Sequence, residues 1–229
     1  MIERDLHFTA SKSSGEVSAI LMRPENAHSL LVLTHGAGAG IRHAFMTGVA
    51  QSLARHGIAS FRYQFPYMEQ GKRAPNQQLI LVETVRSAID AAREHSGDLP
   101  LIAGGKSLGG RMTSTAASEG ALPGIRGIVF FGFPLHAPGK PPNERGEHLF
   151  KVGLPLLFLQ GTRDKLADLT LLRPLCDRLR AKGQAELHVI DGADHSFHVP
   201  KKSGRTDEDI LEELGKVVAD WASNLETHV

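Results

Sequence analysis

Residues 101–110 read LIAGGKSLGG, an apolar run that passes through two glycines and Lys106 into Ser107 and two further glycines. The apolar stretch at 99–104 predicts a buried strand, and residues 107–118 predict the helix that follows it. A serine on such a tight strand-to-helix turn projects its hydroxyl beyond the sheet, and glycine is needed on both sides of it. The free N–H groups at the helix start stabilise a developing oxyanion. The stretch therefore predicts a nucleophilic serine at Ser107.

The same residues allow two other interpretations. A phosphate-binding P-loop requires a glycine five residues before Gly105, but Pro100 stands there. Ser107 as a plain helix-capping residue is the second alternative. Because the G-x-S-x-G pentapeptide is weak by itself, its interpretation depends on the strand before it and on partners further along the chain.

The rest of the chain alternates between strand-like and helix-like segments. Strands are expected at 16–22, 30–34, 58–63, 99–104, 127–131, 154–160 and 185–190, and helices at 42–56, from Pro75 onward, and at 107–118, 169–182 and 206–225. Pro174 is expected to delay the start of its regular helix. Such alternation predicts right-handed crossovers and a doubly wound, mostly parallel sheet. We expect one α/β domain over 1–229, a three-layer α/β/α sandwich with its site at the carboxyl ends of the strands.

A serine nucleophile needs a base and a carboxylate that orients the base. Asp164 comes just after the strand expected at 154–160, and His195 comes just after the last expected strand. The chain order Ser107, Asp164, His195 is that of the α/β-hydrolases. These three side chains are expected to converge.

Other acidic and histidine residues compete for the same roles. His188 and His198 are alternatives for the base, and Asp168 and Asp194 for the acid, with Asp168 also placed to cap a helix. The cluster Asp191, Asp194, His195 and His198 also suggests a metal, but no distant fourth ligand accompanies it, so no metal site is expected.

A glycine-rich loop, HGAGAG at 35–40, follows an early strand. A dinucleotide fingerprint would need a third glycine where Ile41 or His43 stands. With GKSLGG at 105–110, GTRD at 161–164 and GADH at 192–195, the chain resembles the α/β-hydrolase superfamily along nearly its whole length. It looks most like the small, lidless, dienelactone-hydrolase-like members. True dienelactone hydrolases carry a cysteine nucleophile, so Ser107 departs from them and the lactone substrate is not carried over.

The resemblance has further implications. The N–H groups of Ala37 and Leu108 would form the oxyanion hole, and His35 would stabilise its loop without taking part in the chemistry. The run FRYQFPYMEQGKR at 61–73 is similar to a subgroup that includes a chromatin-complex subunit of animals. No organic cofactor is implied.

Two loops are candidate walls of the site. Residues 132–153 contain four prolines, Pro134, Pro138, Pro141 and Pro142, which argue against a helical lid. The loop 64–76 offers Phe65, Tyr67 and Met68 as an apolar substrate-binding surface. Its Lys72 and Arg73 suggest an anionic substrate, with a solvated turn as the alternative.

The composition excludes several classes of protein. The 229 residues are 41% apolar and 22% charged, with 26 Lys and Arg against 25 Asp and Glu, so nucleic-acid and membrane partners are not expected. No apolar run approaches the ~20 residues of a membrane span. The single cysteine, Cys176, excludes a disulfide framework and is expected to be buried and inert. No secretory signal is visible at the N-terminus, so a cytoplasmic location is expected.

The sequence thus predicts a serine hydrolase that cleaves a small carboxylic ester or thioester through a Ser-His-Asp triad and an acyl-enzyme. The partner expected is a small-molecule substrate, for a monomer or homodimer. Cleavage of amide, lactone or C–C bonds on the same fold is an alternative, because fold does not fix function. A non-catalytic interaction module on a hydrolase scaffold is another.

Overall fold

The computed structural model describes residues 1–136 and 144–226. Within them, eight strands form one sheet in the order β1-β2-β4-β3-β5-β6-β7-β8. The strands are β1 Ile2–Ser11, β2 Gly15–Arg23, β3 Ser29–Thr34, β4 Ile58–Tyr63, β5 Leu101–Lys106, β6 Ile125–Phe131, β7 Leu156–Gly161 and β8 Ala185–Ile190. The helices are α1 Ala44–Arg55, α2 Pro66–Glu69, α3 Gln78–Arg93, α4 Leu108–Glu119, α5 Leu169–Arg180 and α6 Asp207–Glu226. Two 3-10 segments, η1 (Glu144–Lys151) and η2 (Lys201–Ser203), complete the elements.

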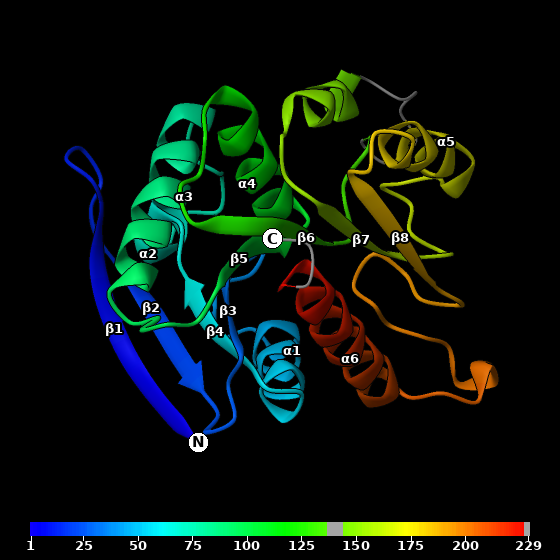
Figure 1. Ribbon diagram of the computed structural model, residues 1–229, viewed down its shortest axis with the longest axis horizontal. Helices are drawn as coiled ribbons and strands as arrows, with labels where there is room; N and C mark the ends of the chain where they lie inside the picture. The colour runs from blue at the N-terminus through cyan, green and yellow to red at the C-terminus, as the bar shows by residue number, and fades with distance from the viewer. Residues whose placement is uncertain (137–143, 227–229) are drawn as a thin grey trace.

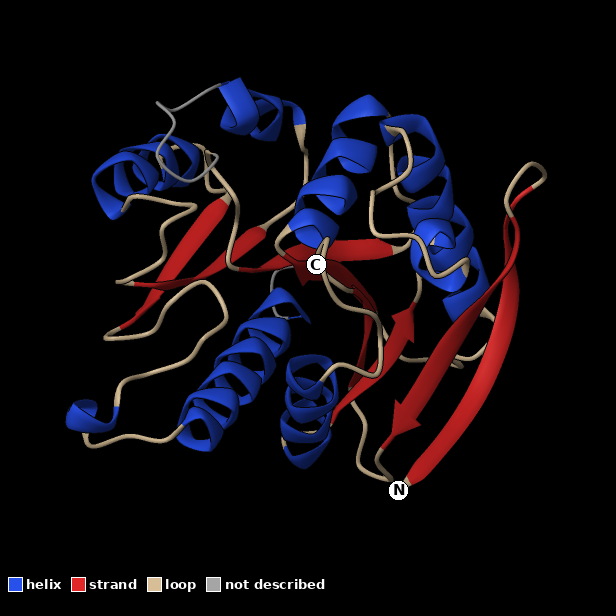
Figure 2. Ribbon diagram, turned by 180° about the vertical axis from the view of Figure 1, so that it is seen from behind, coloured by secondary structure: helices blue, strands red, loops and turns tan. Residues whose placement is uncertain are grey.

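Helices cover both faces of this sheet. In Figure 1, α3, α4 and α5 lie above the sheet and α1 and α6 lie below it, and the same three layers are seen from behind in Figure 2. From β3 to β8 every pairing is parallel, whereas β1 and β2 join antiparallel. The predicted α/β sandwich with a mostly parallel sheet is confirmed.

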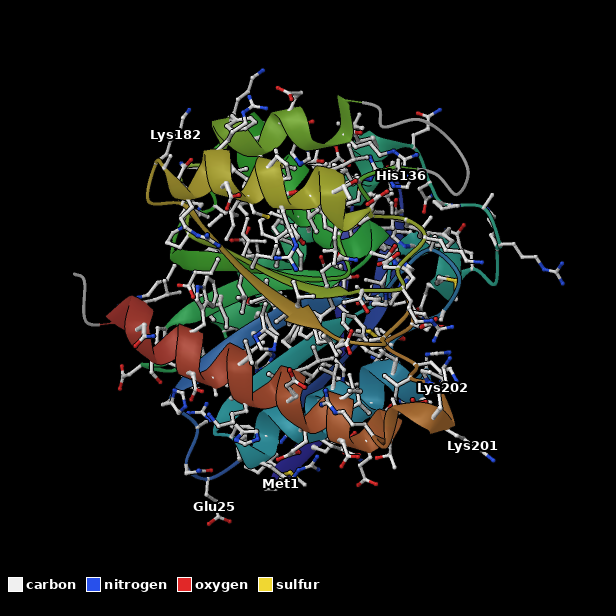
Figure 3. The ribbon with its side chains drawn as sticks, turned by 90° about the vertical axis from the view of Figure 1, so that its right-hand side faces the viewer. Met1, Glu25, His136, Lys182, Lys201 and Lys202 are labelled. Atoms are coloured by element: carbon white, nitrogen blue, oxygen red, sulfur yellow. The ribbon has the colours of Figure 1, made fainter. Side chains whose placement is uncertain are left out.

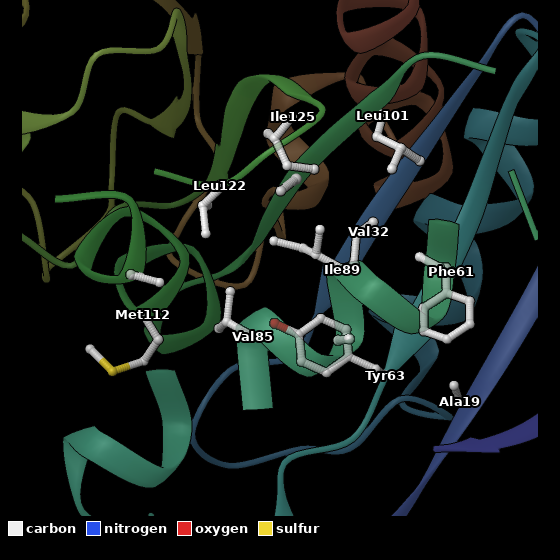
Figure 4. Close-up of a cluster of buried hydrophobic side chains, with 14 of the residues drawn as sticks. Ala19, Val32, Phe61, Tyr63, Val85, Ile89, Leu101, Met112, Leu122 and Ile125 are labelled. Atoms are coloured by element: carbon white, nitrogen blue, oxygen red, sulfur yellow. The ribbon is translucent and has the colours of Figure 1, made fainter. Parts of the chain in front are cut away.

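The packing on the α3 and α4 face follows from the helical spacing of apolar residues. Val85 and Ile89 lie one turn apart on α3 and are both buried. Figure 4 shows them directed at the sheet, where Val32 and Phe61 project from neighbouring strands. Because an amphipathic helix hides only one face, burial of this stripe is what fixes α3 across the strands.

The first strand was not predicted. β1 pairs antiparallel with β2 at the edge of the sheet, and most of its side chains are exposed. An edge strand with charged residues on its open face does not show the apolar run by which buried strands are recognised.

Two helix starts also differ from prediction. Helix α3 begins at Gln78, not at Pro75. Helix α5 begins at Leu169, before Pro174, which lies inside it. Asp168 caps the first turn by accepting the Thr170 N–H at 2.8 Å.

Between β6 and β7, the described residues contain no α-helix, and their one helical segment is η1. Of the residues expected to argue against a lid, Pro138, Pro141 and Pro142 lie outside the described residues. The described remainder places η1 against α4 and α5, where Leu149 and Val152 are fully buried. Figure 3 shows His136 on the α5 side and Lys201 and Lys202 near the start of α6. Among the described residues, no helix is long and apolar enough to span a bilayer.

Candidate active site

Ser107 stands at the junction of β5 and α4 in a strained backbone conformation. Its φ of 51° and ψ of −112° lie outside the regions that side chains normally adopt. A Cβ on Gly105 would lie 2.7 Å from the backbone carbonyl carbon of Gly109, and one on Gly109 would lie 2.7 Å from the His35 carbonyl oxygen. The turn therefore accepts only glycine at both positions. Because the Ser107 side chain makes no capping hydrogen bond to α4, its hydroxyl is free for another contact.

A hydrogen-bonded chain leads from this hydroxyl into the interior. Ser107 Oγ lies 2.9 Å from His195 Nε2, and His195 Nδ1 lies 2.7 Å from Asp164 Oδ2. The Asp164 side chain is 1% exposed and that of His195 is 24% exposed. The structure thus brings together the three side chains that the sequence singled out, from the loops after β5, β7 and β8.

Asp164 is held in its charged form. Burial by itself would raise the pKa of Asp164, but the hydrogen bond and charge of His195 and the Leu166 N–H lower it, and the net pKa lies below the ordinary value. The Leu166 N–H donates to Oδ1 at 2.7 Å, while Oδ2 accepts from His195 and from the Gln160 amide. A carboxylate fixed by three donors keeps the imidazole in one orientation.

The competing histidines are engaged elsewhere. His188 Nε2 lies 2.6 Å from Glu213 Oε1 on α6. His198 Nδ1 lies 2.8 Å from Asp207 Oδ2, and this exposed contact raises the pKa of His198. Neither imidazole is within hydrogen-bond distance of the Ser107 hydroxyl.

The two competing aspartates form hydrogen bonds with backbone N–H groups and do not contact His195 Nδ1. Asp168 caps α5. Asp194 Oδ1 accepts the N–H groups of Ser196 at 2.8 Å and His198 at 3.0 Å, and the Asp194 N–H donates to the His198 carbonyl. The loop that carries His195 is therefore closed on itself.

His35 holds the loop that precedes α1. The imidazole is fully buried, donates from Nδ1 to the Gly36 carbonyl at 2.7 Å and accepts the Phe65 N–H at Nε2 at 3.0 Å. Burial lowers the pKa of His35 to about 4, so the ring is neutral and its tautomer is fixed. These contacts are those of a residue that supports the loop.

The expectation that Phe65, Tyr67 and Met68 form an apolar wall of the cleft is corrected by the structure. Phe65 and Tyr67 are fully buried and Met68 packs against the same core cluster, because α2 turns this segment beneath the 36–39 loop. The Tyr67 hydroxyl donates to the Ala37 carbonyl at 2.9 Å and approaches the Gly36 carbonyl at 3.4 Å. These side chains support the loop from below and do not line the cleft.

A cleft of about 340 Å³ opens beside Ser107. Its lining residues are Gly36, Ala37, Gly38, Ala39, His43, Phe45, Met46, Lys106, Ser107, Leu166, His195 and Ser196. Lys72 and Arg73 are exposed and are not among them, so these two side chains give no support to an anionic substrate. A larger hollow of about 710 Å³ lies at the amino ends of β7 and β8, away from this chemistry.

Leu108 and Ala37 are the two residues whose N–H groups were expected to form the oxyanion hole. Leu108 is the first residue of α4, so its N–H has no acceptor within the helix. Ala37 lines the same cleft as Ser107. The Ala37 carbonyl accepts a hydrogen bond from the Tyr67 hydroxyl, and the Leu108 side chain packs against the core cluster of the α3 and α4 face.

Comparisons with known proteins agree with this architecture. A family model described as an alpha/beta hydrolase domain matches residues 27–223. The chain belongs to this family. An alpha-beta serine hydrolase homologue from Coxiella burnetii has a similar structure, with a TM-score of 0.74 and 17% identity over 96% of this chain and 97% of that one.

Two further solved structures resemble this α/β-hydrolase domain. A serine hydrolase without a lid from Xanthomonas campestris gives a TM-score of 0.73 at 18% identity, covering 96% of this chain and 94% of that one. A dienelactone hydrolase from Anabaena variabilis gives 0.72 at 19% identity, covering 97% and 98%. At such identities the likeness concerns the fold alone.

Other side chains bear on what this α/β-hydrolase domain could bind. Among residues 1–136 and 144–226, no group of three or more His, Cys, Asp or Glu gathers as a metal site. Cys176 is fully buried, and burial raises the pKa of its thiol to about 12, so it is inert as expected.

Sequence reasoning missed Gln160. This fully buried side chain accepts the Phe133 N–H at Oε1 at 3.1 Å and donates from Nε2 to Asp164. Its amide therefore links the end of β6 to the carboxylate. A polar residue at the end of the otherwise apolar run LLFLQ was the available signal.

Proposed function

We propose that this protein is a serine hydrolase that cleaves small carboxylic esters or thioesters by acyl transfer. The observation that carries the proposal is the continuous contact from Ser107 Oγ through His195 to the buried Asp164, at the edge of an apolar cleft. A hydroxyl, an imidazole and a carboxylate in this order make up the arrangement that activates a serine.

The first half of the reaction forms an acyl-enzyme. Ser107 Oγ attacks the carbonyl carbon while its proton passes to His195 Nε2. The tetrahedral intermediate collapses as the carbon–oxygen or carbon–sulfur bond to the leaving group breaks. The leaving group takes the proton from Nε2. Water then attacks the acyl-enzyme, giving its proton to Nε2, and Ser107 recovers a proton as the acid departs.

Asp164 acts on the imidazole. Its carboxylate accepts from Nδ1, so Nε2 is the unprotonated nitrogen that faces Ser107, and its charge stabilises the imidazolium formed in the transition state. The N–H groups of Ala37 and Leu108 bind the oxyanion in this proposal. Loss of one such donor typically costs about 10²–10³ in rate.

The size of the cleft favours small acyl groups. Its apolar lining includes Phe45, Met46 and Leu166, and about 340 Å³ is at the small end of the usual range of ligand pockets. Short-chain esters of a good leaving group are therefore the substrates to try first.

A fluorophosphonate probe tests the proposal directly. Wild type should be labelled and should hydrolyse p-nitrophenyl acetate, and both reactions should disappear in Ser107→Ala. Ser118→Ala is the matched control, because Ser118 lies near the far end of the same helix and bonds only to the Thr115 carbonyl. Folded wild type that neither reacts with the probe nor hydrolyses the ester would contradict the proposal and favour an interaction module on a hydrolase scaffold.

A further inference from the structure

Lys106, the residue before Ser107, occupies an unusual position. Its ammonium group lies 5.8 Å from the centre of the Phe45 ring and 5.4 Å from that of Phe197. The two rings are stacked at 5.5 Å with 14° between their planes. Its Nζ also donates to the His195 carbonyl oxygen. Cation–π contacts strengthen as the cation is withdrawn from water, and Lys106 is partly buried.

The three aromatic and cationic residues come from the three segments that carry the chemistry. Lys106 ends β5 immediately before the nucleophile turn. Phe45 lies in the first turn of α1, just after the 36–39 loop. Phe197 belongs to the same closed loop as His195. One cation thus ties the serine turn, the glycine-rich loop and the histidine loop together.

The backbone conformation of Phe197 also holds its ring in this contact. Phe197 and Ser107 are the two non-glycine residues with positive φ among the described residues, and the Phe197 φ is 62°. Such a conformation is unfavourable for a residue other than glycine and persists only where the surroundings enforce it. Here it turns the ring inward to 2% exposure, onto Phe45.

We propose that Lys106 is a positioning residue: its ammonium group, held at the Phe45 and Phe197 rings, fixes the histidine loop so that His195 stays in contact with the Ser107 hydroxyl. The inference rests on the proposed hydrolase function. Lys106 acts through His195 and exchanges no proton with the substrate.

The charge of Lys106 can be switched by pH. Burial lowers its pKa to about 8, while the charges of Asp164 and Asp194 act in the opposite direction. The other titratable groups at this cleft are His43 and His195. Since the cation is what binds the carbonyl and the rings, the contact weakens as the pH rises through about 8.

Lys106→Met tests the inference, because methionine keeps much of the apolar stem and removes the charge. We expect kcat/KM for p-nitrophenyl acetate to fall about 10²-fold, the cost typical of a misplacement near 1 Å, mainly in kcat and with little change in KM. Lys106→Arg should recover much of the rate and lack the decline that wild type shows above about pH 8. Lys182→Met is the control, because Lys182 also contacts a ring, Phe150, but lies at the distant end of α5.

Hydrogen exchange gives a readout that does not need turnover. Exchange within residues 191–200 should accelerate in Lys106→Met and in Phe45→Leu, with the rest of the protein protected as in wild type. Unchanged exchange together with a rate within threefold of wild type would overturn the inference. If wild type does not react with the probe at all, the proposed function fails, and accelerated exchange in the variants still supports the positioning role.

Discussion

Replacing Ser107 by glycine should make the protein more stable than replacing it by alanine. Alanine keeps the Cβ and therefore keeps the strain of the 51° φ, whereas glycine adopts that conformation without strain. Both substitutions remove the hydroxyl and its contact with His195, and neither removes a helix cap, because the serine provides none. The difference between the two variants therefore isolates the strain at this position.

The expected size of the difference follows from two opposing terms. Strain at such a backbone position is about 1–3 kcal/mol. The greater freedom of glycine in the unfolded chain costs about 0.5–1 kcal/mol. Glycine should thus exceed alanine by about 1 kcal/mol in free energy of unfolding, which corresponds to about 2–4 °C in Tm for a chain of this size.

Urea unfolding and calorimetry measure this difference. Ser118 supplies the control pair, because it lies within the helix α4. There the order should reverse, with glycine less stable than alanine by about 0.5–1 kcal/mol. A Ser107→Gly variant no more stable than Ser107→Ala would show that the turn is not strained and would refute the reasoning.

Three further predictions concern the same site. Asp164→Asn should lower kcat by about 10⁴-fold in steady-state ester hydrolysis, because an amide NH₂ facing Nδ1 favours the wrong imidazole tautomer; a loss below tenfold would contradict this role. Tyr67→Phe should slow probe labelling about tenfold and cost about 1 kcal/mol of unfolding free energy, since the Ala37 carbonyl loses its donor; an unchanged labelling rate would show that the loop needs no such support. Between pH 8 and 10.5 the unfolded chain binds more protons at Lys106 than the folded one, so this group makes the unfolding free energy rise with pH. Urea midpoints of wild type and Lys106→Met should therefore diverge over that window, and parallel profiles would argue against the lowered pKa.

The positions of the three catalytic candidates could be predicted because each follows the carboxyl end of a strand. Those ends meet at one edge of a parallel sheet, so residues 107, 164 and 195 converge wherever the strands are correctly recognised. The glycines around Ser107 could also be understood, because their role is local. The competing Asp168 was recognised as a helix cap from its place before an apolar helix.

The supporting contacts could not be predicted, because they join segments distant in sequence. An aromatic residue in a loop, such as Tyr67, is equally suited to line a cleft or to lie beneath it, and only the short helix α2 decides. The contacts of Lys106 could not be predicted from the sequence around it. Its partners Phe45 and Phe197 come from α1 and from the histidine loop, which only the folded structure brings together. Strand β1 was not predicted, because its exposed polar residues break the apolar pattern by which a strand is recognised.

The residues that support the catalytic candidates differ from the residues that border the cleft, and this affects how the substrate preference can evolve. Tyr67, His35 and Gln160 act from beneath the loops, out of reach of a ligand. Met46 and Leu166 border the cleft with their side chains, and the one supporting contact from these two residues, Leu166 to Asp164, is made by the backbone N–H. Single substitutions of these two side chains can therefore change which substrates bind while the contacts among Ser107, His195 and Asp164 are kept. A protein built in this way can acquire new substrates one substitution at a time.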